Sequence, residues 1–237
     1  MPTDVRHRYH EELDSIERSA LESLDMVAES LEQATAALRD RDMGLATRVI
    51  GGDDRIDDRY LEIHQEALSL IAREAPVATD LRLIAAILHT MRHVERMGDQ
   101  CVNICKLVPL AGHEPPVEAE ILARIEEMSR RLNTQINDAK RCFSERSLGL
   151  AELVARSDAE INRLNREIFR IALEVGSDFD TREWAMLMML AARSLERIGD
   201  NAVDICEQVA YIVTGEFREF SDASSPAGGT AAATPGG

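Results

Sequence analysis

Two short acidic motifs are the part of this sequence best suited to chemistry. The stretch from Glu95 to Asp99 reads Glu-Arg-Met-Gly-Asp, and the stretch from Glu196 to Asp200, 101 positions later, reads Glu-Arg-Ile-Gly-Asp. Each motif holds a Glu and an Asp four residues apart, so on an α-helix both carboxylates lie on one face. Paired carboxylates of this kind suit a hard metal cation.

A second set of paired side chains lies upstream of each motif. Asp53 and Asp57 are four residues apart, and Asp158 and Asn162 repeat that spacing 105 positions later. If neighbouring helices align, two pairs face each other across one groove in each half of the chain. The candidate metal ligands are therefore Asp53, Asp57, Glu95 and Asp99 in the first half and Asp158, Asn162, Glu196 and Asp200 in the second.

Crowded carboxylates need a compensating partner. Like charges about 5 Å apart repel by roughly 3 kcal/mol at an effective dielectric constant of about 20. A bound cation would offset this repulsion, and oxygen ligands in this number suit Mg²⁺, Ca²⁺, Mn²⁺ or iron. The alternative is that nearby arginines form ordinary surface ion pairs with the acids, namely Arg92, Arg96, Arg193 and Arg197.

Gly98 and Gly199 occupy the same place in both motifs, directly before the Asp. A glycine inside a helix costs about 1 kcal/mol relative to alanine. Its presence in both copies indicates either that a side chain is unwelcome beside the acids or that two helices come into close contact there.

The sequence offers only weaker candidates for other metal sites and for catalytic sites. His89 and His93 have the spacing of a helical metal-binding pair, but the second half carries Leu190 and Ser194 at the matching positions. No His has a Glu three residues before it, as the di-iron enzymes built on helical bundles require. No phosphate-binding glycine loop and no nucleophile motif is present, so conventional nucleophilic catalysis has no candidate.

The acidic pairs need long helices to position them. Apolar residues recur at alternating steps of three and four in six segments, which predicts six α-helices. These segments run over residues 13–38, 45–70, 77–110, 121–143, 154–175 and 184–212. Long helices with short connections fold back as antiparallel bundles. We therefore expect an all-α protein of two tandem, pseudo-repeated three-helix bundles over residues 1–112 and 113–216, followed by a disordered low-complexity tail over 217–237.

Composition and charge limit the partners and the cellular location that we expect for the protein. The formal net charge of −16 disfavours binding to nucleic acid or to an anionic lipid surface. The polar, charged start of the chain predicts no secretory signal, and the longest apolar run, residues 184–192, is too short to cross a bilayer. We therefore expect a cytoplasmic protein that contacts the membrane only through partners. Two groups of residues are expected in its core. One is the reduced thiols of Cys101, Cys105, Cys142 and Cys206. The other is the methionine cluster beside Trp184, namely Met186, Met188 and Met189, for which a partner-binding surface is the alternative.

The two acidic motifs resemble those of the PhoU family, as do the run Pro76-Val77-Ala78-Thr79-Asp80-Leu81-Arg82 and the opening Tyr9-His10-Glu11-Glu12-Leu13. Members of this family are phosphate-transport accessory proteins and negative regulators of the bacterial phosphate response. The resemblance covers roughly residues 4–216, and the doubled motif at this spacing makes it specific.

The resemblance implies two three-helix bundles, a homodimer, and metal ions on motifs of the form Glu/Asp-x-x-x-Asp, with Mg, Mn or Fe as the expected metals. It nominates Glu95, Asp99, Glu196 and Asp200 first among the ligands, and Asp53, Asp57 and Asp158 next. Asn162 departs from the acidic pattern and leaves the second site one charge poorer.

The resemblance also implies a function: a cytoplasmic, metal-binding regulator of phosphate uptake and of phosphate-starvation signalling. Its partners would be the ATPase of the phosphate ABC transporter and a phosphate-sensing histidine kinase, held in its repressing state when phosphate is plentiful. Two alternatives stay open. One is a metal-dependent phosphohydrolase built on the same carboxylates, and the other is a metal-free helical scaffold.

Overall fold

The computed structural model describes residues 2–111, 118–217 and 219–220, and the long elements within them are all α-helices. They are α1 (Pro2–Asp40), α2 (Met43–Gly52), α3 (Asp54–Glu74), α4 (Ala78–Leu107), α5 (Ala119–Glu145), α6 (Leu148–Glu174) and α7 (Phe179–Thr214). Because α2 and α3 together make up the second expected helix, the prediction of an all-α protein with six long helical segments is confirmed.

The second expected helix is interrupted at Asp53, which lies between α2 and α3. The backbone of Asp53 stays helical, with φ −64° and ψ −34°, and the amides of Ile56 and Asp57 donate to its carbonyl oxygen at 2.8 and 3.1 Å. Its side chain forms no capping hydrogen bond. The carboxylate of Asp53 is therefore available for contacts with a neighbouring helix.

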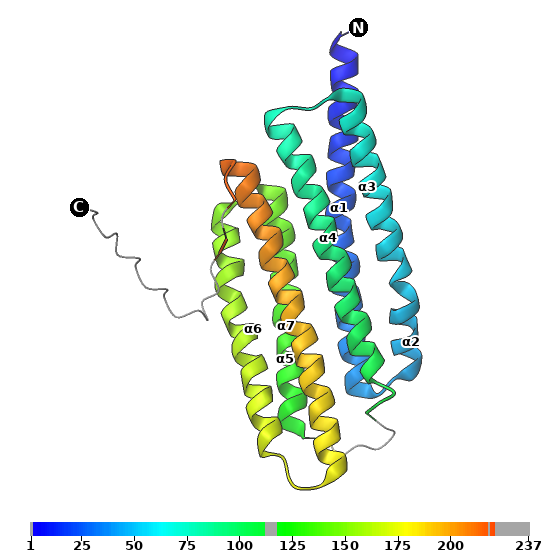
Figure 1. Cartoon of the computed structure of the whole chain (residues 1–237), viewed down its shortest axis with the longest axis vertical. Helices are drawn as coiled ribbons and strands as arrows, with labels where there is room; N and C mark the ends of the chain where they lie inside the picture. Colours follow the sequence, from blue (N-terminus) through cyan, green and yellow to red (C-terminus); the bar gives the residue numbers. More distant parts are fainter. Residues whose placement is uncertain (1, 112–117, 218, 221–237) are drawn as a thin grey trace, which may run out of the picture.

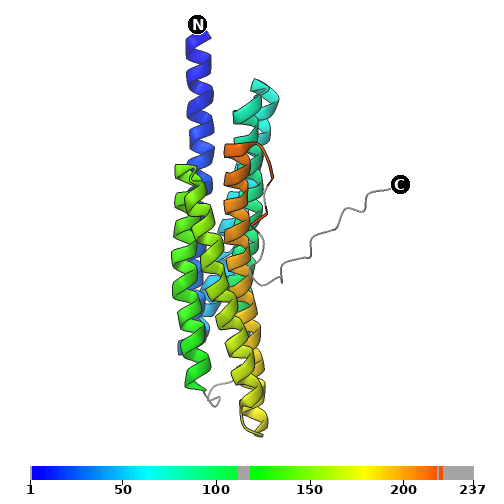
Figure 2. The ribbon, with the colours of Figure 1, turned by 90° about the vertical axis from the view of Figure 1, so that its left-hand side faces the viewer.

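The helices form an elongated slab that is broad in Figure 1 and narrow in Figure 2. In the first half, α1 packs against α2, α3 and α4, and in the second half, α5 packs against α6 and α7. The most extensive contact in the molecule joins the halves, between α4 and α7, which run antiparallel (Figure 1). A second contact between the halves joins α1 and α5.

The apolar stripes expected from the sequence form the core. The stripe residues of α1 between Leu13 and Leu38 and those of α5 between Ile121 and Phe143 are all buried, and they belong to one cluster that runs through both halves. The four cysteines are free and buried as expected. The prediction for the methionines was partly wrong: Met188 is buried, but Met186 is 65% exposed.

The internal repeat is visible in the turns as well as in the sequence. Arg41 after α1 and Arg146 after α5 both adopt the left-handed conformation, with φ 57° and φ 53°. The residue that follows each arginine caps the next helix: Asp42 accepts from the amide of Leu45, and Ser147 accepts from the amide of Leu150. These residues match at the same 105-position offset as the acidic pairs, so both halves enter their second helix by the same turn.

Part of the expected tail packs against the end of α7. Tyr211 and Phe217 stack with ring centroids 4.2 Å apart, and the amide of Phe220 donates to Glu207 Oε1 at 2.8 Å. Residues 112–117 between the two halves, and residues 218 and 221–237 of the tail, lie outside the described residues. None of the helices in the described residues combines the length and the apolar character needed to cross a membrane.

Candidate metal centre

The first acidic cleft lies between the start of α3 and the middle of α4. A Cβ atom built on Gly98 would lie only 2.8 Å from Asp53 Oδ1 and 3.1 Å from Ile56 Cδ1. The missing side chain of Gly98 therefore leaves the space that the Asp53 carboxylate occupies. This contact accounts for the glycine that directly precedes the Asp of the first motif.

The four acids of the first half lie close enough together to influence one another's ionisation. Burial, and then repulsion from Asp57, Asp99 and other nearby acids, raises the pKa of Asp53 to about 6. Burial, and then repulsion from Asp99, raises the pKa of Asp57. Burial also raises the pKa of Glu95; Arg92 opposes this rise, and Asp99 and Asp57 add to it. Burial and mutual repulsion therefore both disfavour the charged forms of Asp53, Asp57 and Glu95.

Arginine neutralises this cleft only in part. Glu95 Oε2 is buried and has no hydrogen-bond partner among the described residues, and the Arg92 Nε atom lies 4.0 Å from it. The Arg92 side chain is half exposed, which limits what such a pair contributes to stability. A buried carboxylate oxygen that accepts no hydrogen bond, in a crowded acidic cleft, fits a hard cation.

The second cleft lies between α5, α6 and α7 and has a different chemistry. A Cβ atom on Gly199 would lie 2.7 Å from Asp158 Oδ1 and 3.2 Å from Gln135 Oε1. Two amides satisfy the buried carboxylate: Asn162 Nδ2 donates to Asp158 Oδ2 at 2.7 Å, and Gln135 Nε2 donates to Asp158 Oδ1 at 3.3 Å. Gly199 thus repeats the role of Gly98, while amides replace acids around the carboxylate.

The remaining residues of the second motif lie at the edge of this cleft. Glu196 pairs with Arg193, three residues before it on α7, as the arginine alternative anticipated. Asp200 is exposed on the same helix. The structure therefore groups Asp158 and Asn162 beside the turn of α7 that carries the motif, and it gives Glu196 a cationic partner of its own.

Gln135 is the residue of this cleft that the sequence reasoning missed. It is 2% exposed, and it lies between the buried stripe residues Leu132 and Ala139 of α5, at the helical spacing of the stripe. The signal available in the sequence was an amide on a mostly apolar face of the expected helix.

Neither cleft is arranged as a finished metal cage. Among residues 2–111, 118–217 and 219–220, no three His, Cys, Asp or Glu side chains form a group that could hold a metal ion. His93 does not face either cleft, because its Nδ1 atom lies 2.9 Å from Asn201 Oδ1 and 3.4 Å from Asp204 Oδ2 across the α4–α7 contact. The first cleft nevertheless fits a cation by charge and by its unpartnered oxygen.

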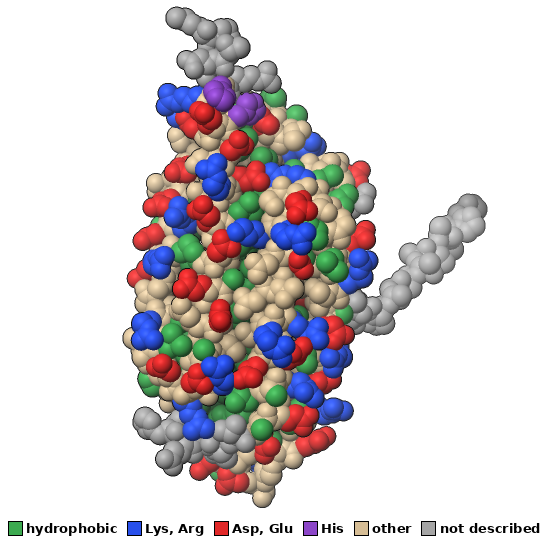
Figure 3. Space-filling model, turned by 180° about the vertical axis from the view of Figure 1, so that it is seen from behind, with side chains coloured by type: hydrophobic (Ala, Val, Ile, Leu, Met, Phe, Trp, Pro, Cys, Tyr) green, Lys and Arg blue, Asp and Glu red, His purple; other side chains and the backbone are tan. Residues whose placement is uncertain are grey.

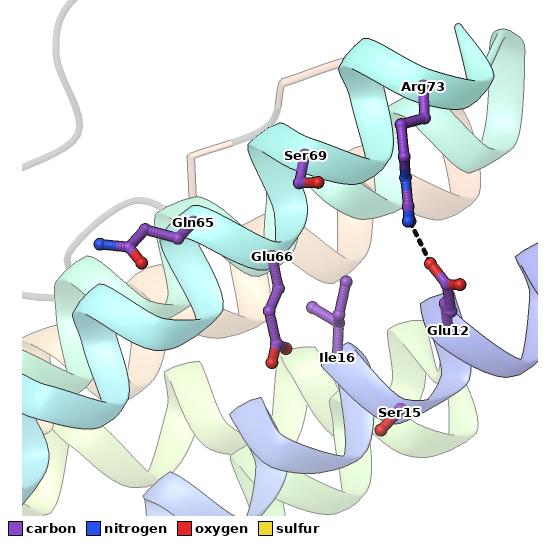
Figure 4. Close-up of a pocket in the computed structure, with 7 residues that line it drawn as sticks. All are labelled: Glu12, Ser15, Ile16, Gln65, Glu66, Ser69 and Arg73. Atoms are coloured by element: carbon purple, nitrogen blue, oxygen red, sulfur yellow. Dashed lines mark hydrogen bonds and ion pairs between the residues drawn. The ribbon is translucent and has the colours of Figure 1, made fainter.

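Other hollows lie elsewhere on the surface of the described residues, including the following two. A cavity of about 430 Å³ between α1 and α3 (Figure 4) contains the ion pair of Arg73 with Glu12 and also Glu66, so its charges do not favour an anion. An apolar groove of about 480 Å³ lies on α6 and α7 and includes the exposed side chains of Phe169 and Met186. On the face seen from behind, acidic and basic side chains are interspersed (Figure 3).

Comparison with known proteins places the fold and the motifs in one family. The family model described as the PhoU domain matches twice, over residues 21–108 and 125–209. The PhoU homolog 1 of the phosphate-specific transport system of Thermotoga maritima is 33% identical over 214 residues, which cover 90% of this chain and 92% of that protein.

Two crystal structures share the fold. The phosphate transport system regulatory protein PhoU from Streptococcus pneumoniae superposes with a TM-score of 0.81 at 25% identity, covering 89% of this chain and 99% of that one. PhoU from Pseudomonas aeruginosa gives a TM-score of 0.77 at 29% identity, covering 88% of this chain and 100% of that one. With both halves matched by the domain and the fold shared along nearly its whole length, the chain belongs to the PhoU family.

Proposed function

We propose that this chain is an accessory regulator of phosphate-specific transport that represses the phosphate-starvation response when phosphate is plentiful. The observation that carries the proposal is the double match to the PhoU domain, together with relatives named as accessory and regulatory proteins of phosphate transport. Because the family consists of accessory proteins and not of enzymes, the phosphohydrolase alternative has no support.

The proposed mode of action is that of a cytoplasmic adaptor. The chain would bind the ATPase of the phosphate ABC transporter and a phosphate-sensing histidine kinase. The conformational state of the transporter would in this way be signalled to the kinase. Long helices packed into a slab offer wide, rigid faces for two partners (Figure 1), and a net charge of −16 favours partners with basic surfaces. A homodimer would double these faces.

Metal binding in the acidic clefts is part of the proposal. Asp53, Asp57, Glu95 and Asp99 would hold a divalent cation such as Mg²⁺, Mn²⁺ or Fe²⁺ in the first half, and Asp158, Asn162, Glu196 and Asp200 would form the weaker site of the second half. The support is the raised pKa of Asp53 and the unpartnered Glu95 Oε2. A cation would supply the charge that neutralises the cleft and draws its ligands together.

The test is complementation in a bacterium that lacks its own PhoU protein. Alkaline phosphatase activity in phosphate-rich medium should be high without the chain and repressed when the chain is expressed. Asp57→Asn/Asp99→Asn, which keeps side-chain size but removes two charges from the first cleft, should lose repression if the cation is needed. Asp14→Asn on the exposed face of α1 is the matched control and should repress normally.

Expression must be compared by immunoblot so that a missing protein is not mistaken for an inactive one. High alkaline phosphatase with abundant, folded wild-type chain would contradict the regulatory proposal. Full repression by the Asp57→Asn/Asp99→Asn variant would remove a metal in the first cleft from the mechanism.

A further inference from the structure

The apolar groove on α6 and α7 leaves large side chains exposed to solvent. It has a volume of about 480 Å³ and lies near the connection between the two helices, toward the lower end of Figure 1. Three of its lining side chains are more than half exposed: Phe169 at 51%, Met186 at 65% and Leu190 at 56%. Exposed apolar side chains that gather in one place mark an interaction site, whereas single ones are ordinary.

The internal repeat shows that the fold does not require these apolar side chains. The α6 helix repeats α3 at an offset of 105, and α7 repeats α4 at an offset of 101. At the positions that match the three exposed side chains, the first half carries His64, Ala85 and His89. Because the same fold accepts two polar rings and a methyl group there, the large apolar side chains of the second half need a reason other than folding.

The lining of the groove carries positive charge, although the chain as a whole has a net charge of −16. Among the described residues, the lining includes Arg166 and Arg193 and no acidic side chain. Arg193 pairs with Glu196 on the same helix, but Arg166 takes part in none of the ion pairs found among the described residues. A partner in this groove therefore gains from acidic side chains beside its apolar ones.

Neither the end of this chain nor a second copy of it suits the groove. Residues 221–237 contain no Leu, Ile, Val, Met or aromatic residue, so they offer no large apolar side chain to fill it. A second copy that docked through the same groove on a two-fold axis would bring the arginines of both copies together. The net charge of −16 also disfavours nucleic acid and anionic lipid as occupants.

We propose that this groove docks one amphipathic helix of a partner protein, with acidic residues beside the apolar stripe of that helix. The proposal names a surface for the adaptor described above and rests on that function. A helix that places its apolar side chains, three and four residues apart, into a groove is a common mode of recognition. Methionine suits such a groove because its flexible side chain adapts to the residues that it contacts.

The experiment places the photo-crosslinking amino acid p-benzoylphenylalanine in the full chain in place of Met186, in the complementation strain. Mass spectrometry of the cross-linked product should identify a helix of another protein that has Asp or Glu beside an apolar stripe. Phe169→His/Leu190→His gives the groove two side chains of the first half. This groove variant should lower the yield of the cross-link at least about fivefold, because it removes two apolar contacts.

Two further comparisons separate the groove from general effects of the surface. Leu61→Ser/Leu68→Ser removes leucines of 53% and 49% exposure from α3, and it should leave the yield unchanged. Arg166→Glu should lower the yield at least about fivefold, and Arg166→Lys should retain it, because the partner responds to the charge at this position. Circular dichroism and urea unfolding of each purified variant establish that the chain is folded.

The outcomes separate this inference from the proposed function. A cross-link to a second copy of the chain, to a lipid or to a basic segment would overturn the inference, and so would equal yields from the groove variant and the α3 variant. A missing cross-link in cells where the chain represses alkaline phosphatase would also overturn it, while the proposed function would stand. A cross-link to an acidic amphipathic helix from a chain that fails to repress would support the docking and contradict the regulatory function.

Discussion

Gly98 and Gly199 each leave a space that a carboxylate from the neighbouring helix fills. Gly98→Ala would press a methyl group against Asp53 Oδ1 and Ile56. Overpacking of this kind costs about 1–3 kcal/mol, and the gain in helix propensity offsets about 1 kcal/mol of it. We expect Gly98→Ala to lower the free energy of unfolding by about 1 kcal/mol in urea titrations, and Gly199→Ala to lower it further because Leu132 and Gln135 also lie within 3.3 Å.

Gly51→Ala is the control for these substitutions. Gly51 is also helical, and a Cβ atom there would meet nothing within 4 Å. The Gly51→Ala substitution should therefore stabilise the protein by up to about 1 kcal/mol through the higher helix propensity of alanine alone. Equal effects at Gly51 and Gly98 would show that the acid does not occupy the space left by Gly98.

Asp53 makes stability depend on pH in a defined direction. Its pKa of about 6 in the folded state lies above the value of 3.8 for the free side chain, so the folded protein keeps this proton where the unfolded chain has lost it. The free energy of unfolding therefore falls as pH rises from about 4 to above 6. After allowance for partial exposure, the loss is on the order of 1 kcal/mol.

The measurement compares wild type with Asp53→Asn, which carries no titrating proton at this position. Both proteins are unfolded in urea at several values between pH 4 and pH 7. The free energy of unfolding of the variant should rise by about 1 kcal/mol relative to that of wild type from the lower to the upper end of this range. Groups outside the first cleft titrate equally in both proteins and cancel in the difference, which therefore reports on Asp53 together with the acids coupled to it. A constant difference across the range would mean that Asp53 ionises normally.

The sequence predicts the charged residues of the clefts better than the neutral ones. Carboxylates at a four-residue spacing stand out because crowded like charges need an explanation, and the structure brings Asp53, Asp57, Glu95 and Asp99 close enough to influence one another. Gln135 carries no charge and belongs to no motif. Its role depends on which helix faces α5, and the helical period does not contain that information.

At the scale of elements, the two halves of the repeat correspond closely through their first turns. They differ in length where α3 and α6 end. The two halves correspond at an offset of 105 up to the acidic pairs of α3 and α6, and at an offset of 101 in α4 and α7. The difference lies at the end of α3, which continues to Glu74. Helix periodicity predicted the six helices and their buried faces, but it could not predict that α4 and α7 would form the main contact between the halves.

A buried hydroxyl pair gives a direct test of the contact between α1 and α5. The Thr35 Oγ1 atom lies 2.9 Å from Ser129 Oγ and 2.9 Å from the carbonyl oxygen of Leu31, and both side chains are buried. Removing one partner leaves the other hydroxyl with fewer bonds in an apolar place, which costs about 1–3 kcal/mol. Thr35→Val and Ser129→Ala should each destabilise the protein by about 1 kcal/mol in urea unfolding.

The double variant isolates the coupling between the two helices. If the hydroxyls interact, Thr35→Val/Ser129→Ala should cost less than the sum of the single effects by at least about 0.5 kcal/mol, because no unpaired partner remains. Thr47→Val/Ser129→Ala is the control pair, since Thr47 is an exposed α2 residue bonded only to the carbonyl oxygen of Met43. Additive effects of Thr35→Val and Ser129→Ala would mean that the two hydroxyls do not interact across the contact between α1 and α5.

At the scale of the whole molecule, the acidic net charge makes the stability of the folded chain depend on cations. A net charge of −16 repels itself in the compact state, and salt of any kind screens part of this repulsion. A cation bound in a cleft acts differently, because it stabilises only the folded chain. At a free concentration one hundred times the dissociation constant, such binding adds about 2.7 kcal/mol, or about 5–10 °C in melting temperature for a protein of this size.

Mn²⁺ should therefore raise the melting temperature above the value in NaCl of equal ionic strength, as measured by circular dichroism. The excess separates binding from screening, because screening depends on ionic strength while binding depends on the ligands. Asp57→Asn/Asp99→Asn should abolish most of the excess, although the variant itself melts at a higher temperature than wild type without metal, since it has lost two repelling charges. An equal excess with Mn²⁺ in the two proteins would show that the cation binds elsewhere and would leave the first cleft without a metal.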